Sequence, residues 1–192
     1  MADRAESSPA TLPGGQQVWI RSIGTDDADA LRAAFQRLSL HSRYHRFHSG
    51  VPQLSDVMVR VLTTVDHVDR EALVAVPAEG SNELVGVVRY VRDPTEPTAA
   101  DLAVTVADQW QGRGLGALLM RELTARAIDN GIEHFTVDML ADNLPIQALV
   151  RTAGGVSVTS DGSVVSARVP ILAERPVTRG GPTMVDEVDP AV

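Results

Sequence analysis

Cysteine is absent from this chain of 192 residues, and so is lysine, because all 17 basic residues are arginine. Without cysteine there is no disulfide framework, no thiolate metal site and no cysteine nucleophile. Without lysine there is no Schiff base, no lysine general base and no lysine of a Walker phosphate-binding motif. Any thiol chemistry therefore belongs to a ligand.

Long apolar runs are also missing. No stretch approaches the ~20 residues that a membrane span needs, and the N-terminus lacks the apolar core of a signal peptide. We therefore expect a cytoplasmic protein without a membrane partner. The net charge of −8 argues against a general nucleic-acid binder. The length suits one domain with a real core, and nothing in the sequence fixes the oligomeric state.

The apolar pattern fades at both ends of the chain. We expect a disordered N-terminal tail over residues 1–16, one domain over 17–170 and a flexible C-terminal tail over 171–192. Caps, turns and apolar periodicity predict the elements between the tails. These are a strand at 17–21, helices at 25–38, 40–47 and 55–62, a hairpin of 72–76 with 84–91, a parallel β-α-β crossover of 101–106, 114–129 and 135–140, a helix from 143 to 153, and a hairpin over 156–169.

A glycine-rich turn, Gln111-Gly-Arg-Gly-Leu-Gly116, joins the first strand of the crossover to its helix. Backbone N–H groups in such a turn point outward at the positive end of the helix dipole, which suits a phosphate or pyrophosphate. A Walker motif would need lysine after the last glycine. Gly112, Gly114 and Ala117 fit a dinucleotide fingerprint, but that fold places its first glycine directly after the strand and continues with further β-α units. A dinucleotide-binding domain therefore does not fit.

Gln111, Gly114 and Gly116 resemble the motif of the GNAT superfamily, the acetyl-CoA-dependent N-acetyltransferases. Asn143, Leu149 and Gly154-Gly155 resemble the second motif of that family. The resemblance covers about residues 17–169 and implies a single-domain mixed α/β fold, with a central mixed sheet and helices on both faces. Segments 40–47, 65–72 and 101–108 look most similar to the acetyltransferase domain of bacterial Pat-type protein lysine acetyltransferases.

This resemblance implies acetyl-CoA as the co-substrate, no metal, and an amine acceptor, with a protein lysine favoured over a small amine. The turn would hold the CoA pyrophosphate through its backbone, and the preceding strand would pair with the pantetheine arm. Asn143 would contact the cofactor and also cap its helix. The expected cofactor-binding residues are Val104, Thr105, Val106, Gln111, Gly112, Arg113, Gly114, Leu115, Gly116 and Asn143.

Asp101 matches the position at which Pat-type enzymes resemble one another in carrying a glutamate base, so we expect it to be the general base, acting through a water because its side chain is shorter. The tyrosine with which many relatives protonate the departing thiolate is replaced here by Val150. Solvent or the substrate ammonium can protonate that thiolate. The missing tyrosine and the shortened acid keep open a third function, that of a CoA-binding module without catalysis.

Residues around the acceptor site follow from the same resemblance. The helix at 40–47 borders that site in the family, and the segment 65–72 is shared with Pat-type domains. The candidates are Tyr44, Arg46, Phe47 and His67. His41, His45 and His48 fall near one helical face, but with no acid or cysteine beside them we expect a solvated basic face and not a metal site.

Overall fold

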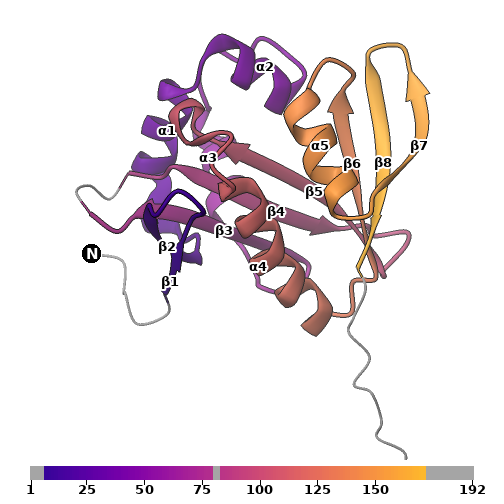
Figure 1. Cartoon of the computed structure of the whole chain (residues 1–192), viewed down its shortest axis with the longest axis horizontal. Helices are drawn as coiled ribbons and strands as arrows, with labels where there is room; N and C mark the ends of the chain where they lie inside the picture. The colour runs from indigo at the N-terminus through magenta and orange to yellow at the C-terminus, as the bar shows by residue number, and fades with distance from the viewer. Residues whose placement is uncertain (1–6, 80–82, 172–192) are drawn as a thin grey trace, which may run out of the picture.

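The computed structural model describes residues 7–79 and 83–171, which form one eight-stranded sheet with helices on both faces (Figure 1). The strands lie in the order β1-β2-β3-β4-β5-β6-β8-β7. Neighbouring strands are antiparallel except β5 and β6, which are parallel as predicted. The expected mixed α/β fold is confirmed. The strands are β1 (Ser8–Thr11), β2 (Gln17–Ser22), β3 (Arg70–Pro77), β4 (Gly86–Arg92), β5 (Ala99–Val106), β6 (His134–Leu140), β7 (Val156–Asp161) and β8 (Val164–Pro170).

Three of the helices, α2, α3 and α5, begin at a polar side-chain cap. Ser39, Ser55 and Asn143 each accept a hydrogen bond from the backbone N–H three residues later, a contact worth about 1 kcal/mol. Short 3₁₀ turns at 25–27 and 108–110 precede α1 and the glycine turn. The helices are α1 (Ala28–Arg37), α2 (Leu40–Phe47), α3 (Asp56–Thr63), α4 (Leu115–Asp129) and α5 (Leu144–Thr152).

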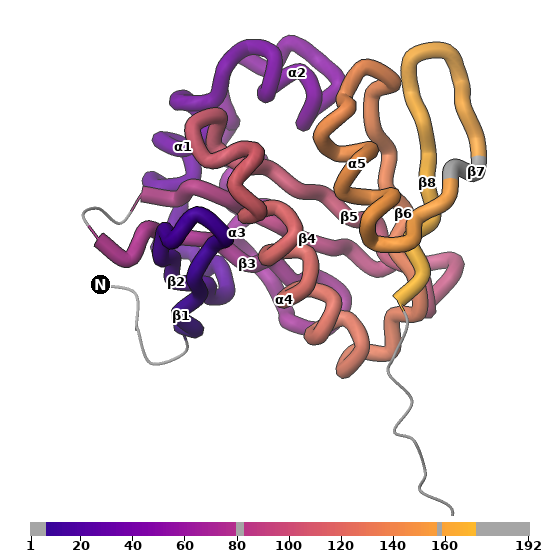
Figure 2. Tube along the Cα trace, viewed as in Figure 1, coloured from indigo at the N-terminus to yellow at the C-terminus, as the bar shows by residue number. Residues whose placement is uncertain are grey.

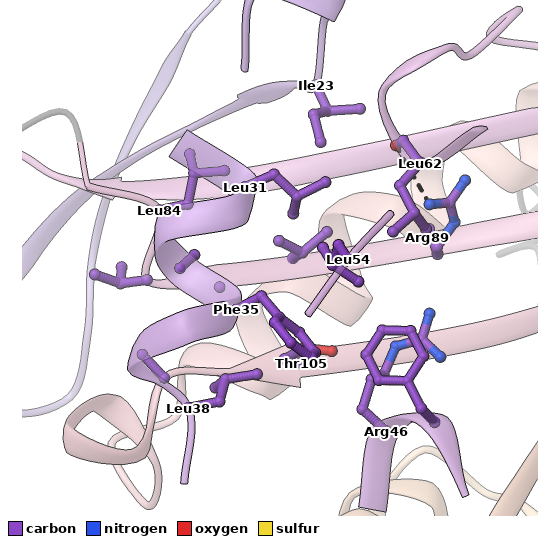
Figure 3. A pocket seen from close by; sticks show the side chains of 16 residues that line it. Ile23, Leu31, Phe35, Leu38, Arg46, Leu54, Leu62, Leu84, Arg89 and Thr105 are labelled. Carbon is purple, nitrogen blue, oxygen red and sulfur yellow. Dashed lines mark hydrogen bonds between the residues drawn. The ribbon is translucent and has the colours of Figure 1, made fainter. Parts of the chain in front are cut away.

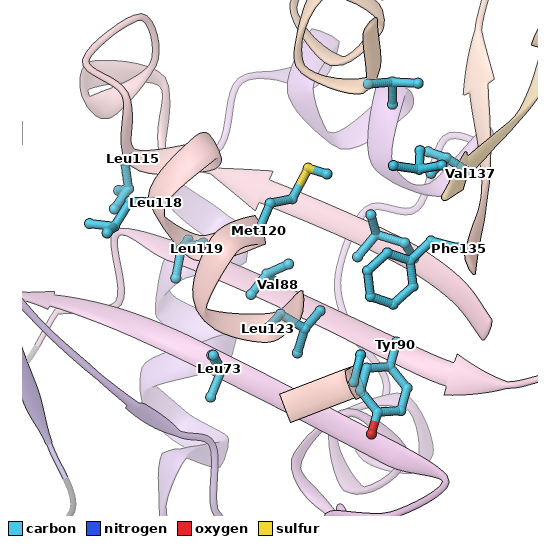
Figure 4. Close-up of a cluster of buried hydrophobic side chains, with 14 of the residues drawn as sticks. Leu73, Val88, Tyr90, Leu115, Leu118, Leu119, Met120, Leu123, Phe135 and Val137 are labelled. Atoms are coloured by element: carbon cyan, nitrogen blue, oxygen red, sulfur yellow. The ribbon is translucent and has the colours of Figure 1, made fainter. Parts of the chain in front are cut away.

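Two apolar clusters hold the helices to opposite faces of the sheet. On one face, α4 buries Leu115, Leu119 and Leu123, one stripe at a spacing of four residues, against sheet residues that include Tyr90 (Figure 4). On the other face, α1 and α3 cover the even-numbered residues from 72 to 76 of β3. Because β3 is buried on both faces, the two clusters share it as their centre.

The N-terminal segment differs from the expected tail. Residues 8–11 form β1, which pairs with β2, and Leu12 is buried with 2% of its surface exposed. The chain then turns back at Gly15, whose φ of +84° favours glycine. A four-residue edge strand is too short to give a periodic pattern, which is why composition predicted disorder there. Residues 1–6, 80–82 and 172–192, with the rest of both expected tails and part of the first hairpin turn, lie outside the described residues.

The parallel pair of strands separates along its length. β5 and β6 pair only where residues 99–101 lie beside residues 134–136. Beyond Asp101, β5 stays paired with β4 on its other side, and β6 stays paired with β8. The two traces therefore diverge toward the end at which α2 and α5 lie (Figure 2). Val104, Thr105 and Val106 consequently present an edge of β5 that is not paired with β6.

Among the described residues, no helix is both long and apolar enough to cross a membrane. The cytoplasmic location expected from the sequence stays a prediction.

Candidate functional site

A cleft of about 440 Å³ lies along the edge of β5 that is not paired with β6. Its walls come from the unpaired edge of β5, the glycine turn with the start of α4, one side of α5 and one side of α2. A volume in this range is typical of sites for small molecules and cofactors. Nine of the ten expected cofactor-binding residues line it, namely Val104, Thr105, Val106, Gln111, Gly112, Gly114, Leu115, Gly116 and Asn143.

Arg113 is the member of that set that does not line the cleft. Its guanidinium lies over the ring of Trp110, 5.8 Å from the ring centroid, and Trp110 itself lines the cleft. The indole was not among the predicted residues, because a single tryptophan before a turn carries no specific signal. Arg113 thus acts on the cleft wall through the residue that it covers.

The glycine turn presents backbone donors at the start of a long helix. Gly112 and Gly114 have φ of +69° and +86°, values that favour glycine, and Gly114 is the N-cap of the 15-residue α4. In the described part of the chain, the N–H groups of Gly112, Arg113 and Gly114 donate to no backbone carbonyl. Together with the positive end of the helix dipole, they suit the binding of an anionic phosphate.

Gln111 has a structural contact that the motif alone does not reveal. Its side-chain amide donates to the Val106 carbonyl at 3.0 Å and to the Ser42 hydroxyl at 3.3 Å. Its own N–H donates to the Asp108 carbonyl at 3.3 Å. Gln111 therefore fixes the end of β5 to α2, and its N–H is already engaged within the turn.

Asp108 reinforces the same connection. Its carboxylate accepts from the Ser39 N–H and hydroxyl and from the Ser42 hydroxyl at 2.7 to 2.9 Å. Burial alone would raise the pKa of Asp108, but the hydrogen bonds from Ser42 and Ser39 outweigh it and hold the pKa below 3.8. The ionised carboxylate thus anchors the start of α2 beside the cleft.

One side of α2 faces the cleft and carries histidines. His41, Ser42, His45 and Arg46 line it, and sequence reasoning had assigned only the arginine to the site. The centroids of the His41 and His45 rings lie 3.8 Å apart with the ring planes tilted by 56°, and His45 Nε2 lies 3.2 Å from a carboxylate oxygen of Asp142. The expected solvated face is wrong for His45, whose side chain is 9% exposed. Asp142 is 97 residues away along the chain, so no local pattern could join the two, and the described residues contain no cluster that could hold a metal.

Asp101 lies where the two strands separate. It is the last residue of β5 paired with β6, opposite Thr136. Since Leu102 packs into the cluster beneath α4, strand alternation places Asp101 on the other face, together with Thr105. It does not line the cleft itself. Partial burial, and then the charges of Asp138 and Asp93, raise the pKa of the Asp101 carboxyl above 3.8.

The four expected acceptor-site residues are separated in the structure. Arg46 lines the cleft and also a second pocket, and Phe47 lines that second pocket. Tyr44 is 48% exposed and lines neither. His67 also lines neither, and its Nδ1 lies 3.1 Å from a carboxylate oxygen of Glu71, an ordinary hydrogen bond within its own loop region.

No tyrosine lines the cleft. The chain has two tyrosines, and the one other than Tyr44, Tyr90, is buried and donates its hydroxyl to the Val68 carbonyl at 3.0 Å. Val150, at the position of the tyrosine of relatives, is 3% exposed and packs into the core. The absence of a tyrosine acid, expected from the sequence, thus extends to the whole lining of the cleft.

The raised pKa of Asp101 predicts a stability effect. At pH 7 the ionised Asp101 carboxylate is partly buried and near the charges of Asp138 and Asp93 in the folded state. Unfolding removes both unfavourable effects. Asp101→Asn should therefore raise the melting temperature at pH 7. The gain should fall as pH drops through the raised folded pKa and vanish below about 3.9, where the carboxyl is protonated in both states. Thermal unfolding of both proteins from pH 3 to pH 8 tests this, and an equal or lower melting temperature for the variant at pH 7 contradicts it.

Comparison with known proteins places this geometry in a family. The sequence model of the acetyltransferase (GNAT) family matches residues 32–154. The acetyltransferase Pat of Mycolicibacterium smegmatis is 29% identical over 164 residues, which are 85% of this chain and 48% of that protein. The chain thus spans about half the length of this relative. An acetyltransferase of Pseudomonas aeruginosa is 34% identical over 134 residues, 69% of this chain and 72% of that protein.

Solved structures share the fold. The GNAT domain of PAT from S. lividans superposes with a TM-score of 0.80 at 29% identity, over 85% of this chain and 96% of that domain. A cAMP-binding acyltransferase from Mycobacterium smegmatis superposes with a TM-score of 0.62 at 26% identity, over 87% of this chain and 48% of that protein.

Proposed function

This chain belongs to the acetyltransferase (GNAT) family, and on that premise we propose that it is an acyl-CoA-dependent N-acyltransferase that moves an acetyl group from acetyl-CoA to a primary amine by direct attack. The observation that carries the proposal is the cleft, in which the donors of the glycine turn meet the unpaired edge of β5.

The cleft suits the two chemically different parts of CoA. The N–H groups from Gly112 to Gly116 would bind the pyrophosphate at the start of α4. The edge of β5 from Val104 to Val106 would pair with the amide groups of the pantetheine arm. From Val106 back to Asp101 a strand spans about 16 Å, which roughly suits an extended pantetheine arm. The thioester would then lie near the point at which β5 and β6 separate.

The transfer needs a free amine. Its nitrogen attacks the thioester carbonyl carbon, a C–N bond forms, the C–S bond breaks, and CoA leaves as a thiolate. An ammonium of pKa ~10.4 needs about 4.6 kcal/mol to lose its proton at pH 7, so a nearby base lowers the barrier. Asp101 would accept this proton through a water. The thiolate, of pKa ~8.5, takes a proton from solvent or from the substrate ammonium.

The pH dependence of the rate should reflect these groups. We expect kcat/KM to rise with pH through an ionisation of Asp101 or of the amine, without a descending limb near pH 10, because no tyrosine lines the cleft. Initial rates of CoA release from pH 5 to pH 10.5 test this, with enzyme stability checked at each pH. A tyrosine-like decline near pH 10 that disappears in Tyr44→Phe would show that this tyrosine is the general acid.

Three functions are compatible with this cleft, and measurements of acetyl-CoA binding and of acetyl transfer distinguish them. A protein lysine is the acceptor that the Pat resemblance favours, a small amine is the second, and a CoA-binding module without catalysis is the third. Calorimetry with acetyl-CoA tests binding, and steady-state CoA release with lysine peptides and small amines tests transfer. Binding without transfer to any amine would support the module. Absence of binding would contradict all three.

A further inference from the structure

A second, apolar pocket of about 60 Å³ adjoins the cleft, on the face of the sheet that α1 and α3 cover. Leu31, Phe35 and Leu54 are among its apolar walls, and Arg46 and Arg89 are its two charged residues (Figure 3). We call it the arginine pocket. Arg46 and Thr105 line both the cleft and the arginine pocket. The two cavities therefore meet at these residues, beside the edge of β5 along which the thioester would approach.

The two arginine side chains lie at the same end of the arginine pocket (Figure 3). Arg89 is 7% exposed and donates to the Leu62 carbonyl at 3.3 Å. Arg46 lies over the ring of Phe47, 5.0 Å from its centroid. Burial, and then the charges of Arg46 and Arg70, lower the pKa of Arg89 to about 10. Burial also lowers the pKa of Arg46, so both guanidinium groups are held where their charge is disfavoured.

A purely structural role does not account for this pair. Elsewhere in the same protein, Arg21 is paired with Asp27 by two hydrogen bonds of 2.7 Å, and Arg126 with the buried Glu71 at 3.1 Å. In the described part of the chain, neither Arg46 nor Arg89 is paired with a carboxylate. Guanidinium groups in apolar surroundings are costly unless an anion compensates them. The missing anion is expected to come from a ligand.

The opposite charge lies a short distance along the same face of the sheet. Arg89 is in register with Ala103, which makes Asp101 its diagonal neighbour on β5, about 7–8 Å away between backbone positions. Asp138 and Asp93 add to the negative potential at Asp101. A ligand here meets a pair of cations at one end and acids at the other, which complements a molecule that carries both an ammonium and a carboxylate.

We propose that the acceptor is a free amino acid with an apolar side chain, an inference that rests on the proposed function. The side chain would enter the arginine pocket, whose walls are mostly apolar. The carboxylate would bind the guanidinium groups of Arg46 and Arg89, and the amine would face the thioester and Asp101. Asp101 would take the ammonium proton through a water, and the free amine would then attack the thioester carbon, forming the amide C–N bond and breaking the C–S bond. CoA would leave as a thiolate that takes a proton from solvent, and the other product would be an N-acetyl amino acid. The lysine side chain of a protein would bring a third cation without a carboxylate.

Matched acceptors test the carboxylate directly. Leucine, leucinamide and 3-methylbutylamine share the apolar group and the amine but differ in the carboxylate, and methionine with methioninamide repeats the comparison. We expect kcat/KM for CoA release to be 10- to 100-fold, to order of magnitude, higher for the acids. A lysine peptide should be a poorer acceptor than either acid. Equal rates for acids and amides, or a preference for the peptide, would overturn the proposal.

A variant ties that preference to the arginine pocket. Arg89→Met keeps much of the side-chain volume and removes the charge, so the ratio of kcat/KM for leucine to that for leucinamide should fall to near one, with acetyl-CoA affinity retained. Arg121, on α4, has a side chain that is 72% exposed, and within residues 7–79 and 83–171 its one ion pair is with its neighbour Glu122. Arg121→Met is therefore the matched control, and its ratio should equal that of the parent. An unchanged ratio in Arg89→Met would place the carboxylate elsewhere.

Two further measurements separate failure of this inference from failure of the proposed function. Calorimetry of leucine and leucinamide with the CoA-saturated protein reports carboxylate recognition without turnover, and equal or absent binding of the two overturns the inference. If amines are acetylated without a carboxylate preference, the proposed function stands and the inference fails. Replacing acetyl-CoA by succinyl-CoA tests the other source of a carboxylate. A strong succinyl preference that Arg89→Met abolishes would assign the guanidinium groups to the acyl chain and overturn the acceptor proposal.

Discussion

Replacing Gly116 by leucine should weaken acetyl-CoA binding by ~10²-fold or more, about 2.7 kcal/mol, whereas alanine at the same position should leave it within a few fold. Gly116 lies in the first turn of α4 and lines the cleft. A Cβ atom there would lie 3.5 Å from Leu149 and 3.8 to 4.0 Å from Val106 and Val104, which is ordinary van der Waals contact. Alanine therefore fits, and the longer leucine would extend into the space that the pantetheine arm needs.

Calorimetric titration with acetyl-CoA measures this difference, and circular dichroism checks the fold of both variants. The pair is well matched because alanine and leucine are both good helix formers, each more favourable than glycine by up to about 1 kcal/mol. Helix propensity therefore does not disfavour either variant, and the circular dichroism comparison reports any loss of folding. If Gly116→Leu folds like the parent and binds acetyl-CoA as tightly, the ligand does not occupy this part of the cleft.

Gly114 is a less suitable position for the same test, although its place in the motif would suggest it first. Its φ of +86° is a conformation that other residues adopt at a cost of about 1–2 kcal/mol. A Cβ atom there would also lie 3.1 Å from Pro13. A side chain at Gly114 would therefore disturb the N-terminal segment and the turn together. Only the structure shows that Gly114 tolerates a side chain less well than Gly116, because Pro13, which that side chain would meet, is distant from Gly114 in sequence.

Local signals were sufficient for most of the fold. Ser55 and Asn143 mark helix starts because each has a side-chain oxygen that reaches the N–H of the third following residue. The crossover from β5 through α4 to β6 followed from a strand pattern, a helix pattern and a second strand pattern in succession. β1 was missed because its four residues are stabilised by pairing with β2 and not by a pattern of their own.

The residues of the site also fall into two groups, those that the sequence predicts and those that only the fold brings together. The glycine turn and the edge of β5 are contiguous in sequence, so a motif could predict both. Ser42 and Asp108 are 66 residues apart and meet only in the folded chain, and no local pattern joins His45 to Asp142. Arg89 did leave a trace in the sequence, as the one charged residue within the otherwise apolar run from Val85 to Val91. An arginine on an exposed strand face is common, but Arg89 is buried beside Arg46 of α2 and Leu62 of α3, and in the part of the chain that the structure describes no carboxylate is paired with it.

Asp101→Asn should lower turnover by ~10²-fold or more at pH 7, because the amide keeps the shape of the carboxylate but cannot accept a proton. The affinity for acetyl-CoA should change little, since Asp101 does not line the cleft. Asp101→Glu keeps the carboxylate and should retain or raise activity. Steady-state kinetics with an acceptor that the parent acetylates, together with calorimetry for acetyl-CoA, measure both quantities for all three proteins.

The stability of the same variant distinguishes a base from a structural acid. A carboxylate whose pKa is raised by burial and by Asp138 and Asp93 costs folding free energy at pH 7. If Asp101 is the general base, Asp101→Asn should have a lower turnover than the parent and a higher melting temperature at pH 7. A variant that gains stability but turns over as fast as the parent would make Asp101 an acid at a strand opening without a catalytic role. The base would then be sought in an ordered water at the point where β5 and β6 separate, because His67 is engaged with Glu71 away from the cleft.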